Sequence, residues 1–258
     1  MSLISIVVPV YNNAASLADL MRRFQELAAK DAACRYEFIF VDDGSFDESY
    51  PVLQQLAQEE RRMRVVKLSR NFGSNAAIMA GLSQARGEAV AAIAADLQDP
   101  PELIAEMLLH WQAGAKVVLA ARQTRDDGFL SNLLSDTFYA LFRRFAIRSM
   151  PRRGFDFFLI DRQVCDHINR IQENNVYLMG LILWLGFEPK VIYYHRQKRD
   201  RRYGRSMWTL RRKIKYFIDS FVAFTYFPVR AASLIGICLS LLGLLYALII
   251  LVLRLAYA

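Results

Sequence analysis

The sequence predicts an α/β fold in which a mostly parallel sheet is covered by helices on both faces. Short apolar runs alternate with stretches of helical periodicity through the first hundred residues, and such alternation indicates right-handed βαβ units. Polar residues also follow each apolar run, as they do where strands enter loops. A chain of 258 residues is long enough for one such domain with a large core.

The expected strands and helices take turns along the chain. Apolar runs predict strands at residues 3–10, 37–41, 64–68, 89–95, 116–121, 154–160 and 188–195. Apolar residues three and four apart predict helices at residues 16–29, 47–60, 75–85, 130–145 and 176–187, and a further helix opens at Glu102 after two prolines. The 130–145 helix has an apolar stripe and ends in Arg143 and Arg144. It therefore fits two positions equally well, packed against the domain or lying on a membrane surface.

The composition narrows the classes of partner. The 33 Lys and Arg exceed the 25 Asp and Glu, which gives a net charge of +8, while 54% of the residues are hydrophobic. This content is too apolar for a typical nucleic-acid-binding protein. The positive charge indicates either a solvated surface or an anionic membrane or phosphate partner. Cys34, Cys165 and Cys238 lie far apart in apolar contexts, so they predict neither a disulfide framework nor a metal site, as expected in a reducing compartment.

The carboxyl-terminal part predicts a membrane anchor. Residues 231–253 are 23 residues without a charge, which as a helix would span about 34 Å and cross the hydrocarbon core of a bilayer. Basic residues are concentrated before this segment and only Arg254 follows it, so the amino-terminal side is expected in the cytoplasm. The amino terminus enters a strand without a signal peptide, which agrees with this orientation. These features divide the chain into a globular domain (1–206), an amphipathic interfacial helix (207–230) and a transmembrane helix (231–254).

Polar side chains follow the strands at one edge of the predicted sheet. Each of them comes directly after an apolar run, and a parallel sheet delivers such residues to one crevice. They are Tyr11, Asp42, Asp43, Asn71 and Asp96. Carboxylates there suit the donor groups of a base and ribose, and an aromatic ring can stack on the base. The sequence contains neither Gly-x-Gly-x-x-Gly nor Gly-x-x-x-x-Gly-Lys, so it lacks the usual dinucleotide and P-loop motifs. Each Asp alone also fits a turn or a helix cap, and only their joint position favours a nucleotide site.

The stretch 94–102, Ala-Ala-Asp-Leu-Gln-Asp-Pro-Pro-Glu, lies at the centre of this edge. Asp96 and Gln98 stand at the end of a buried strand. A carboxylate and an amide oxygen two residues apart suit a hard cation that carries phosphates. The same residues also fit a strand-to-helix turn without a ligand.

Four motifs carry a family resemblance. They are Val-Pro-Val-Tyr-Asn at 8–12, Val-Asp-Asp-Gly-Ser at 41–45, Ser-Arg-Asn-Phe-Gly at 69–73 and Asp-Leu-Gln-Asp-Pro-Pro-Glu at 96–102. Together they resemble glycosyltransferase family 2, and within it the polyprenyl-phosphate glycosyltransferases related to dolichol-phosphate mannose synthase. The resemblance extends over about residues 3–230 and onward into the membrane segment. The last motif is the most specific of the four, because the first two occur across the whole superfamily.

The resemblance implies a GT-A fold, a UDP- or GDP-sugar donor, Mg or Mn as cofactor, and inverting transfer of the sugar to a polyprenyl phosphate such as undecaprenyl phosphate. The positions that it implies for the nucleotide sugar are Pro9, Tyr11, Asn13, Asp42, Asp43, Arg70, Asp96, Gln98, Arg201 and Ser206. The metal would be held by Asp96 and Gln98. The acceptor phosphate would be held by Arg122, Arg125 and Ser135. The expected location is the bacterial cytoplasmic membrane with the site facing the cytoplasm, in cell-envelope glycan or lipopolysaccharide biosynthesis, as a monomer or a homo-oligomer.

The candidate catalytic residues are Asp96 and Asp156. A phosphate oxygen is already ionised at neutral pH and can attack without a general base. Asp156, on the predicted strand 154–160, is therefore expected to orient a neighbour or to be structural rather than to abstract a proton. His167 and His195 have no partners at ligand spacing in the sequence and are expected to be structural.

The sequence departs from the family pattern at three positions. Ala94 stands where the family often has the first Asp of Asp-x-Asp, and Asn13 replaces the usual Glu. The shell of a Mg ion would then be completed by diphosphate oxygens and water. Met207 replaces the Lys of the family's Arg-x-x-Gly-x-Ser-Lys loop, where Arg205 could supply the charge.

These departures leave an alternative function open. The chain could be a catalytically silent relative that binds a nucleotide sugar or scaffolds a membrane complex. A processive polysaccharide synthase is disfavoured because its Gln-x-x-Arg-Trp motif does not occur. Members of the resembling family usually have a second membrane helix, and one predicted span lies within these 258 residues.

Overall fold

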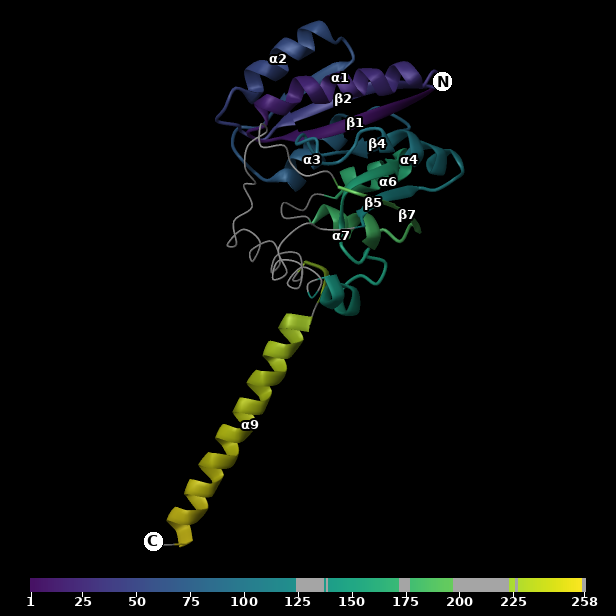
Figure 1. The fold of residues 1–258 in the computed structure, drawn as a ribbon. Helices are drawn as coiled ribbons and strands as arrows, with labels where there is room; N and C mark the ends of the chain where they lie inside the picture. The colour runs from purple at the N-terminus through teal and green to yellow at the C-terminus, as the bar shows by residue number, and fades with distance from the viewer. Residues whose placement is uncertain (124–136, 138, 172–176, 197–222, 226, 257–258) are drawn as a thin grey trace.

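A computed structural model describes the chain except for residues 124–136, 138, 172–176, 197–222, 226 and 257–258. The described strands form one sheet of seven in the order β3-β2-β1-β4-β6-β5-β7 (Figure 1). The strands are β1 (Ser2–Val10), β2 (Cys34–Asp42), β3 (Met63–Lys67), β4 (Ala89–Ala92), β5 (Val117–Arg122), β6 (Phe155–Asp161) and β7 (Pro189–Tyr194). The helices are α1 (Ala14–Lys30), α2 (Ser49–Glu59), α3 (Ser74–Gln84), α4 (Leu103–Gln112), α6 (Arg162–Asn169), α7 (Leu178–Trp184) and α9 (Phe227–Ala256).

The sheet is mixed, and the prediction of a mostly parallel sheet is confirmed. Four of the six neighbouring pairs are parallel, whereas β6 runs antiparallel to both β4 and β5. Every residue of β6 between Phe157 and Ile160 is buried. A strand that is apolar on both faces carries no sequence pattern that distinguishes its direction.

The strand directions determine what meets at each edge of the sheet. Because β1 to β5 and β7 all run the same way, their carboxyl ends lie along one edge, and the reversed β6 begins at that same edge. The predicted site residues after β1, β2, β3 and β4 therefore share this edge with the end of β5 at Arg122 and the start of β6 near Asp156. This rim is where an open α/β sheet binds its ligands.

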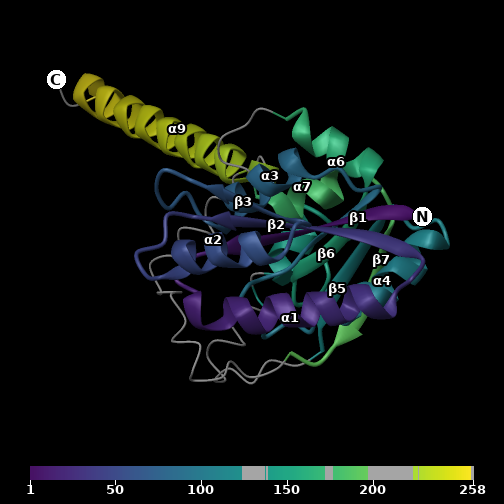
Figure 2. The ribbon, with the colours of Figure 1, turned by 90° about the horizontal axis from the view of Figure 1, so that it is seen from above.

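Helices cover both faces of the sheet and enclose two separate cores (Figure 2). In β1 the side chains of Ile6 and Val8 face the layer of α1, α2 and α4, while Val7 between them faces α3, α6 and α7. This alternation follows from the two-residue period of a strand. Helix α1 buries Leu17, Leu20, Met21, Phe24 and Leu27 on one face, which confirms the helical stripe expected there.

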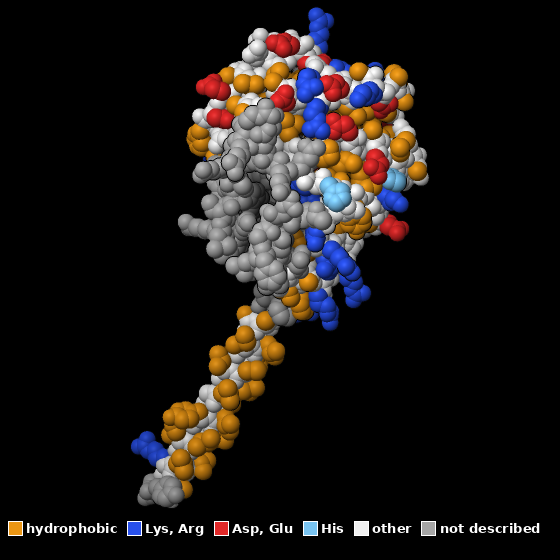
Figure 3. Space-filling model, in the orientation of Figure 1, with side chains coloured by type: hydrophobic (Ala, Val, Ile, Leu, Met, Phe, Trp, Pro, Cys, Tyr) orange, Lys and Arg blue, Asp and Glu red, His pale blue; other side chains and the backbone are white. Residues whose placement is uncertain are grey.

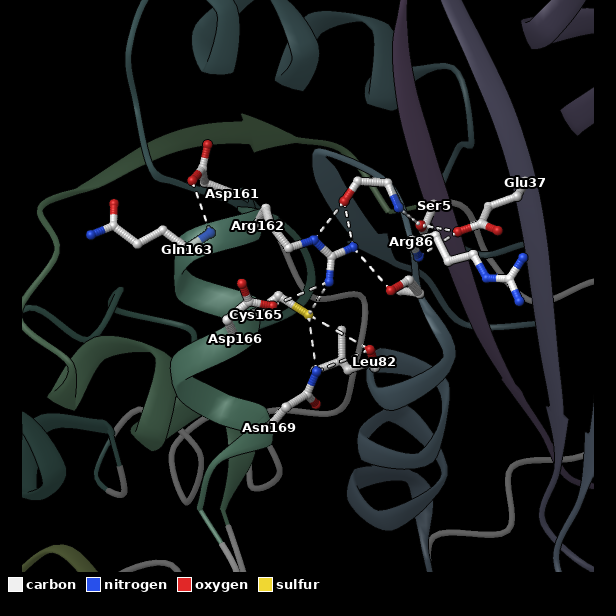
Figure 4. Close-up of polar contacts among 12 residues, drawn as sticks. Ser5, Glu37, Leu82, Arg86, Asp161, Arg162, Gln163, Cys165, Asp166 and Asn169 are labelled. Atoms are coloured by element: carbon white, nitrogen blue, oxygen red, sulfur yellow. Dashed lines mark hydrogen bonds and ion pairs between the residues drawn. The ribbon is translucent and has the colours of Figure 1, made fainter.

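The amino-terminal edge of the sheet is closed by a polar network (Figure 4). The Glu37 carboxylate accepts hydrogen bonds from Ser5 Oγ at 2.5 Å and from the Arg86 backbone N–H at 2.7 Å. Arg162, the first residue of α6, donates through Nε to the Gly87 carbonyl at 2.8 Å and through Nη2 to the Ala85 carbonyl at 3.0 Å. These groups satisfy one another and join α6 to the sheet.

Helix α9 extends away from the globular domain and is long and apolar enough, over Val229–Ala256, to cross a membrane (Figures 1 and 3). Its most apolar window is not buried against any described part of the chain. The segment just before α9 packs against the globular domain. There the ring centroid of Phe224 lies 6.4 Å from that of Phe142 and 6.2 Å from that of Tyr177. A Cβ on Gly180 would lie 2.6 Å from the Phe224 ring, so glycine permits this close contact.

Several element boundaries differ from those expected from the sequence. β4 ends at Ala92 rather than continuing to residue 95, and β2 is longer than expected because it begins at Cys34. α9 begins at Phe227, so residues 227–230, which the sequence assigns to the interfacial helix, are continuous with the expected transmembrane helix. Residues 207–222 of that predicted helix, and residues 130–136 of the predicted 130–145 helix, lie outside the described residues. Within the described part of the latter, Phe142 is fully buried whereas Leu141 and Phe145 are exposed.

Candidate functional site

The loops after β1 and β2 are tied together by hydrogen bonds at the rim. Asn12, in the left-handed region at φ 54°, donates its backbone N–H to Ser45 Oγ at 3.0 Å, and its Oδ1 accepts the Phe46 N–H at 2.9 Å. Asn13 donates its N–H to Ser49 Oγ at 2.8 Å, and its Oδ1 accepts the Tyr11 N–H at 3.2 Å. The side chain of Asn13 is therefore occupied in shaping the loop that carries Tyr11.

Asp42 is the last residue of β2 and Asp43 follows it, and both carboxylates are buried. Asp43 Oδ1 and Oδ2 accept the backbone N–H groups of Phe72 at 2.7 Å and of Gly73 at 2.9 Å. Burial raises the pKa of Asp43, with a contribution from Asp42, although these two hydrogen bonds oppose the shift. Asp42 Oδ1 accepts the Ser45 N–H at 3.3 Å, while its buried Oδ2 has no hydrogen-bond partner among the described residues. That oxygen is therefore available to accept a hydrogen bond.

The loop after β3 approaches the loop after β2 closely at Gly44. Gly44 has φ +68°, and a Cβ there would lie 2.6 Å from the carbonyl carbon of Arg70. Only glycine meets both the backbone angle and the space. The guanidinium of Arg70 lies 4.1 Å from the ring centroid of Phe72, and both side chains are exposed at the rim. The segments 11–13, 42–45 and 70–73 are called the backbone-held loops below, because backbone N–H groups make most of their contacts.

Asp96 and Gln98 lie after β4 in the turn that leads to α4. Leu97 between them has φ 57°, and Asp96 Oδ1 accepts the Gln98 N–H at 3.2 Å. Ser16 Oγ donates to the Ala95 carbonyl at 2.7 Å, so α1 fixes the start of this turn. A left-handed φ at a non-glycine residue is a strained conformation of the kind found at ligand sites.

Asp96 and Gln98 offer two protein oxygens to a divalent metal, and other ligands must complete its coordination shell. Within the described residues, no group of three or more His, Cys, Asp or Glu side chains is placed to hold a metal. One carboxylate and one amide oxygen suit a Mg or Mn ion that takes its remaining oxygens from a diphosphate and water. Ala94, half-buried before this turn, contributes no ligand atom from its side chain.

Near Asp96, polar and charged side chains from β5, β6, the end of β7 and the loop after β4 lie close together. Asp99 is buried, and its Oδ1 accepts hydrogen bonds from the Tyr194 hydroxyl at 2.5 Å and from Arg196 Nε at 3.1 Å. Arg196 Nη2 also lies 3.8 Å from Asp96 Oδ2. Burial raises the pKa of Asp99 even though Arg196 and Arg122 oppose the shift.

Arg122 and Asp156 form an ion pair in the same region. Arg122 ends β5 and Asp156 follows Phe155, whose register partner in β5 is Ala121, so the antiparallel pairing places the two side chains together. Arg122 is buried whereas the Asp156 side chain is half-exposed. Burial opposes the charge of Arg122, but Asp156 and Asp99 outweigh it and raise the pKa of the guanidinium. Asp99, Arg122, Asp156, Tyr194 and Arg196 are called the ion-pair cluster below.

The structure brings most of the predicted site residues to the carboxyl-terminal edge of the sheet. Pro9 lies in β1 beside Val41 of β2, directly before the loops that carry the rest. Arg125, Ser135, Arg201 and Ser206 lie outside the described residues. His167 and His195 are both exposed, and the His167 ring lies 6.3 Å from that of Phe187.

Asp99, Tyr194 and Arg196 were not expected in the site from the sequence. Asp99 lies within the motif at 96–102, but an Asp before two prolines commonly caps the helix that follows. Tyr194 and Arg196 are two positions apart at the end of the last predicted strand. Residues with this spacing point to the same face of a strand. That spacing was the available signal.

The mixed, mostly parallel sheet has the GT-A fold, because the structure is similar to solved structures of GT-A glycosyltransferases. The sequence model of Glycosyl transferase family 2 matches residues 5–169, and the chain belongs to this family.

Two relatives are similar over most of this chain. One is the uncharacterized glycosyltransferase YkcC of Bacillus subtilis, with 38% identity over 252 residues, which cover 97% of this chain and 77% of the relative. The other is the bactoprenol glucosyl transferase of Shigella phage SfV, with 33% identity over 251 residues, covering 94% of this chain and 78% of the relative.

Two solved structures share the fold at low sequence identity. Glucosyl-3-phosphoglycerate synthase from Mycobacterium tuberculosis, in complex with Mn²⁺, UDP and glucosyl-3-phosphoglycerate, has a TM-score of 0.56 at 16% identity and covers 86% of this chain and 78% of its own. The mannosyltransferase PcManGT from Pyrobaculum calidifontis, in complex with GDP-Man and Mn²⁺, has a TM-score of 0.52 at 18% identity and covers 74% of this chain and 56% of its own. Both are similar in fold to this chain.

Proposed function

We propose that this glycosyltransferase moves a sugar from a UDP- or GDP-sugar to a polyprenyl phosphate, with inversion, at the cytoplasmic face of a bacterial membrane. The observation that carries the proposal is the rim itself: Asp42 offers an acceptor oxygen on the same sheet edge as Asp96 and Gln98. The relative named bactoprenol glucosyl transferase supports the lipid acceptor, and the apolar helix α9 supports a membrane location.

The backbone-held loops would bind the nucleoside. Asp42 Oδ2 would accept a donor group of the base or ribose, while the ring of Tyr11 would stack on the base. Asp96 and Gln98 would hold a Mg or Mn ion, which supplies Lewis-acid stabilisation of the leaving diphosphate. Two structures of the same fold contain Mn²⁺ with a nucleotide, which supports a divalent metal here.

The ion-pair cluster would receive the acceptor. Arg122 presents a buried cation on the same edge as Asp96, and a guanidinium matches the oxygens of a phosphate. The ionised phosphate oxygen of the acceptor would attack the anomeric carbon on the side opposite the leaving diphosphate, which inverts that centre. Asp156 would orient Arg122 rather than take a proton. Arg125, Ser135, Arg201 and Ser206 are proposed as further phosphate or diphosphate ligands on the family resemblance.

The membrane orientation rests on charge and on the position of α9. Segment 139–153 carries arginines and no Asp or Glu, and Figure 3 shows Lys and Arg side chains on the domain close to the start of α9. Phe142 in this segment lies in ring contact with Phe224, so the basic segment is close to the first turn of α9. Positive residues at one end of a membrane helix favour the cytoplasmic side.

The test is release of UDP or GDP by the full chain in detergent, with a panel of nucleotide sugars, undecaprenyl phosphate, and Mg or Mn. Turnover should require lipid and metal, and Asp96→Asn should lower it by about 100-fold or more because an interaction with the developing charge is lost. Asp166→Asn, an exposed Asp on α6, is the matched control and should retain activity.

Two outcomes would reject the proposal. Turnover in the absence of polyprenyl phosphate would show that this lipid is not the required acceptor. Nucleotide binding without turnover for any donor would favour the alternative that the chain is a catalytically silent relative. That alternative is suggested by Ala94 and Asn13, which depart from the family pattern.

A further inference from the structure

Arg196 lies between two carboxylates of the loop after β4. Its Nε donates to Asp99 Oδ1 at 3.1 Å, and its Nη2 lies 3.8 Å from Asp96 Oδ2. The first distance is a hydrogen bond, whereas the second is an ion pair beyond hydrogen-bond range. One end of the guanidinium is therefore fixed and the other is held loosely.

The fixed end is a strong anchor because Asp99 is buried. The Asp99 side chain has 0% exposure, compared with 16% for Asp96, and it also accepts the hydroxyl of Tyr194. A buried carboxylate needs a cation or hydrogen bonds nearby, and Arg196 supplies both. The side chain of Arg196 itself is 24% exposed, so its outer nitrogen can reach a ligand at the rim.

The loose end of Arg196 lies at the residue proposed to hold the metal. A guanidinium and a divalent cation repel each other when they share one carboxylate, and the repulsion is strong in a partly buried site. A diphosphate that arrives with the metal brings oxygens of opposite charge, which a guanidinium binds through paired N–H groups. The metal–diphosphate that displaces Arg196 from Asp96 thus also gives the Arg196 guanidinium a new anionic partner, the diphosphate oxygens.

We propose that Arg196 is an exchangeable counter-ion of the site. Without donor it neutralises Asp96, and with donor it remains anchored on Asp99 while its Nη2 transfers to the diphosphate of the nucleotide sugar. This inference rests on the proposed function, since it takes a metal–diphosphate as the ligand at Asp96. It makes Arg196 a diphosphate-binding residue, and it makes Asp99 and Tyr194 positioning residues that act through Arg196.

The test measures two affinities of Arg196→Ala in the full chain in detergent: Mn²⁺ alone, and UDP or GDP in saturating Mn²⁺. The two should change in opposite directions. Mn²⁺ alone should bind several-fold more tightly because its competitor for Asp96 is gone. The nucleoside diphosphate should bind about tenfold or more weakly because a charged hydrogen-bond donor is lost.

Two further variants keep the test decisive. Arg196→Lys retains a cation beside buried Asp99 but lacks the paired N–H groups. It should fold, and its affinities for Mn²⁺ and for the nucleoside diphosphate should change in the same directions as in Arg196→Ala, but by less. Arg23→Ala removes an arginine that pairs with Glu102 on the outer side of the same turn, at 2.5 Å, and should change neither affinity.

A loss of both affinities would identify Arg196 as merely structural, and unchanged affinities in both Arg196 variants would also overturn the inference. If the unsubstituted chain bound neither UDP nor GDP with Mn²⁺, the proposed function would fail and the inference with it. Normal binding by the unsubstituted chain with unchanged variants would reject the inference alone.

Discussion

The two sides of the rim are held by different kinds of contact. In the backbone-held loops, Asp43 is fixed by two backbone N–H groups, and Asn12 and Asn13 are fixed by hydroxyl and backbone groups. In the ion-pair cluster, Arg122 and Arg196 are fixed by the carboxylates of Asp156 and Asp99. Backbone groups cannot leave, whereas side-chain ions can change partners. The difference agrees with the proposals that the backbone-held loops bind the nucleoside and that Arg196 changes partners when the donor binds.

The largest effect expected from this difference is the loss of the close approach between the backbone-held loops. Gly44→Ala would place a Cβ 2.6 Å from the backbone of Arg70 at φ +68°. The combined strain and crowding should lower the free energy of unfolding by roughly 2–4 kcal/mol. Denaturant unfolding measures this, and nucleotide affinity should fall with it.

Gly114→Ala is the matched control, since Gly114 has φ +102° but nothing within 4 Å of a Cβ. It should cost only the backbone strain, about 1 kcal/mol. Equal losses for the two variants would show that the loops are not rigidly packed, which would break the comparison.

A smaller effect is expected from removing a charge in the ion-pair cluster. Asp156→Asn would leave Arg122 without its nearest carboxylate, but the Asp156 side chain is 52% exposed. The loss of unfolding free energy should be about 1–2 kcal/mol at low salt, because water screens the exposed Asp156 carboxylate while Arg122 is buried. It should shrink in high salt because screening weakens the pair in the unsubstituted chain.

The corresponding variant of the backbone-held loops, Asp43→Asn, serves as the comparison in the same salt series. Its loss comes from hydrogen bonds to Phe72 and Gly73, so it should vary less with salt. A stronger salt dependence for Asp43→Asn than for Asp156→Asn would contradict the distinction between the two sides.

The smallest expected effect concerns pH. Burial raises the pKa of Asp43, so the stability associated with its neutral form is present at low pH and is lost as pH rises through the folded-state pKa. Above about pH 4, the ordinary range of an Asp, the unfolding free energy of the unsubstituted chain should decrease with pH relative to that of Asp43→Asn. Chemical unfolding at pH 4, 5, 6 and 7 checks the sign, and a relative increase with pH would be the contrary result.

Much of the fold could be predicted from local pattern. The stripe of Leu17, Leu20 and Phe24 defines α1 because an amphipathic helix must bury one face. The polar residues after β1, β2 and β4 were expected together, because parallel strands end at one edge. The reversal of β6 was not predictable, since Phe157 and Phe158 are buried on opposite faces and carry no directional pattern.

The ion-pair cluster was largely beyond reach from the sequence. Arg122 and Asp156 were each expected in the site, but their pairing depends on the direction of β6. The contact between Asp99 and Arg196 joins residues 97 positions apart, and nothing in either local sequence specifies it. Contacts between distant charged residues depend on tertiary packing, which one sequence does not display.

The outward position of α9 implies two different tolerances to mutation within one chain. Side chains in the cores of the globular domain must fit their neighbours, so a change of one methylene is felt there. The apolar window of α9 is not packed against any described part of the chain. In that window, exchange among Leu, Ile, Val and Phe should be nearly neutral, and the sequence of α9 can drift as long as its hydrophobicity is retained.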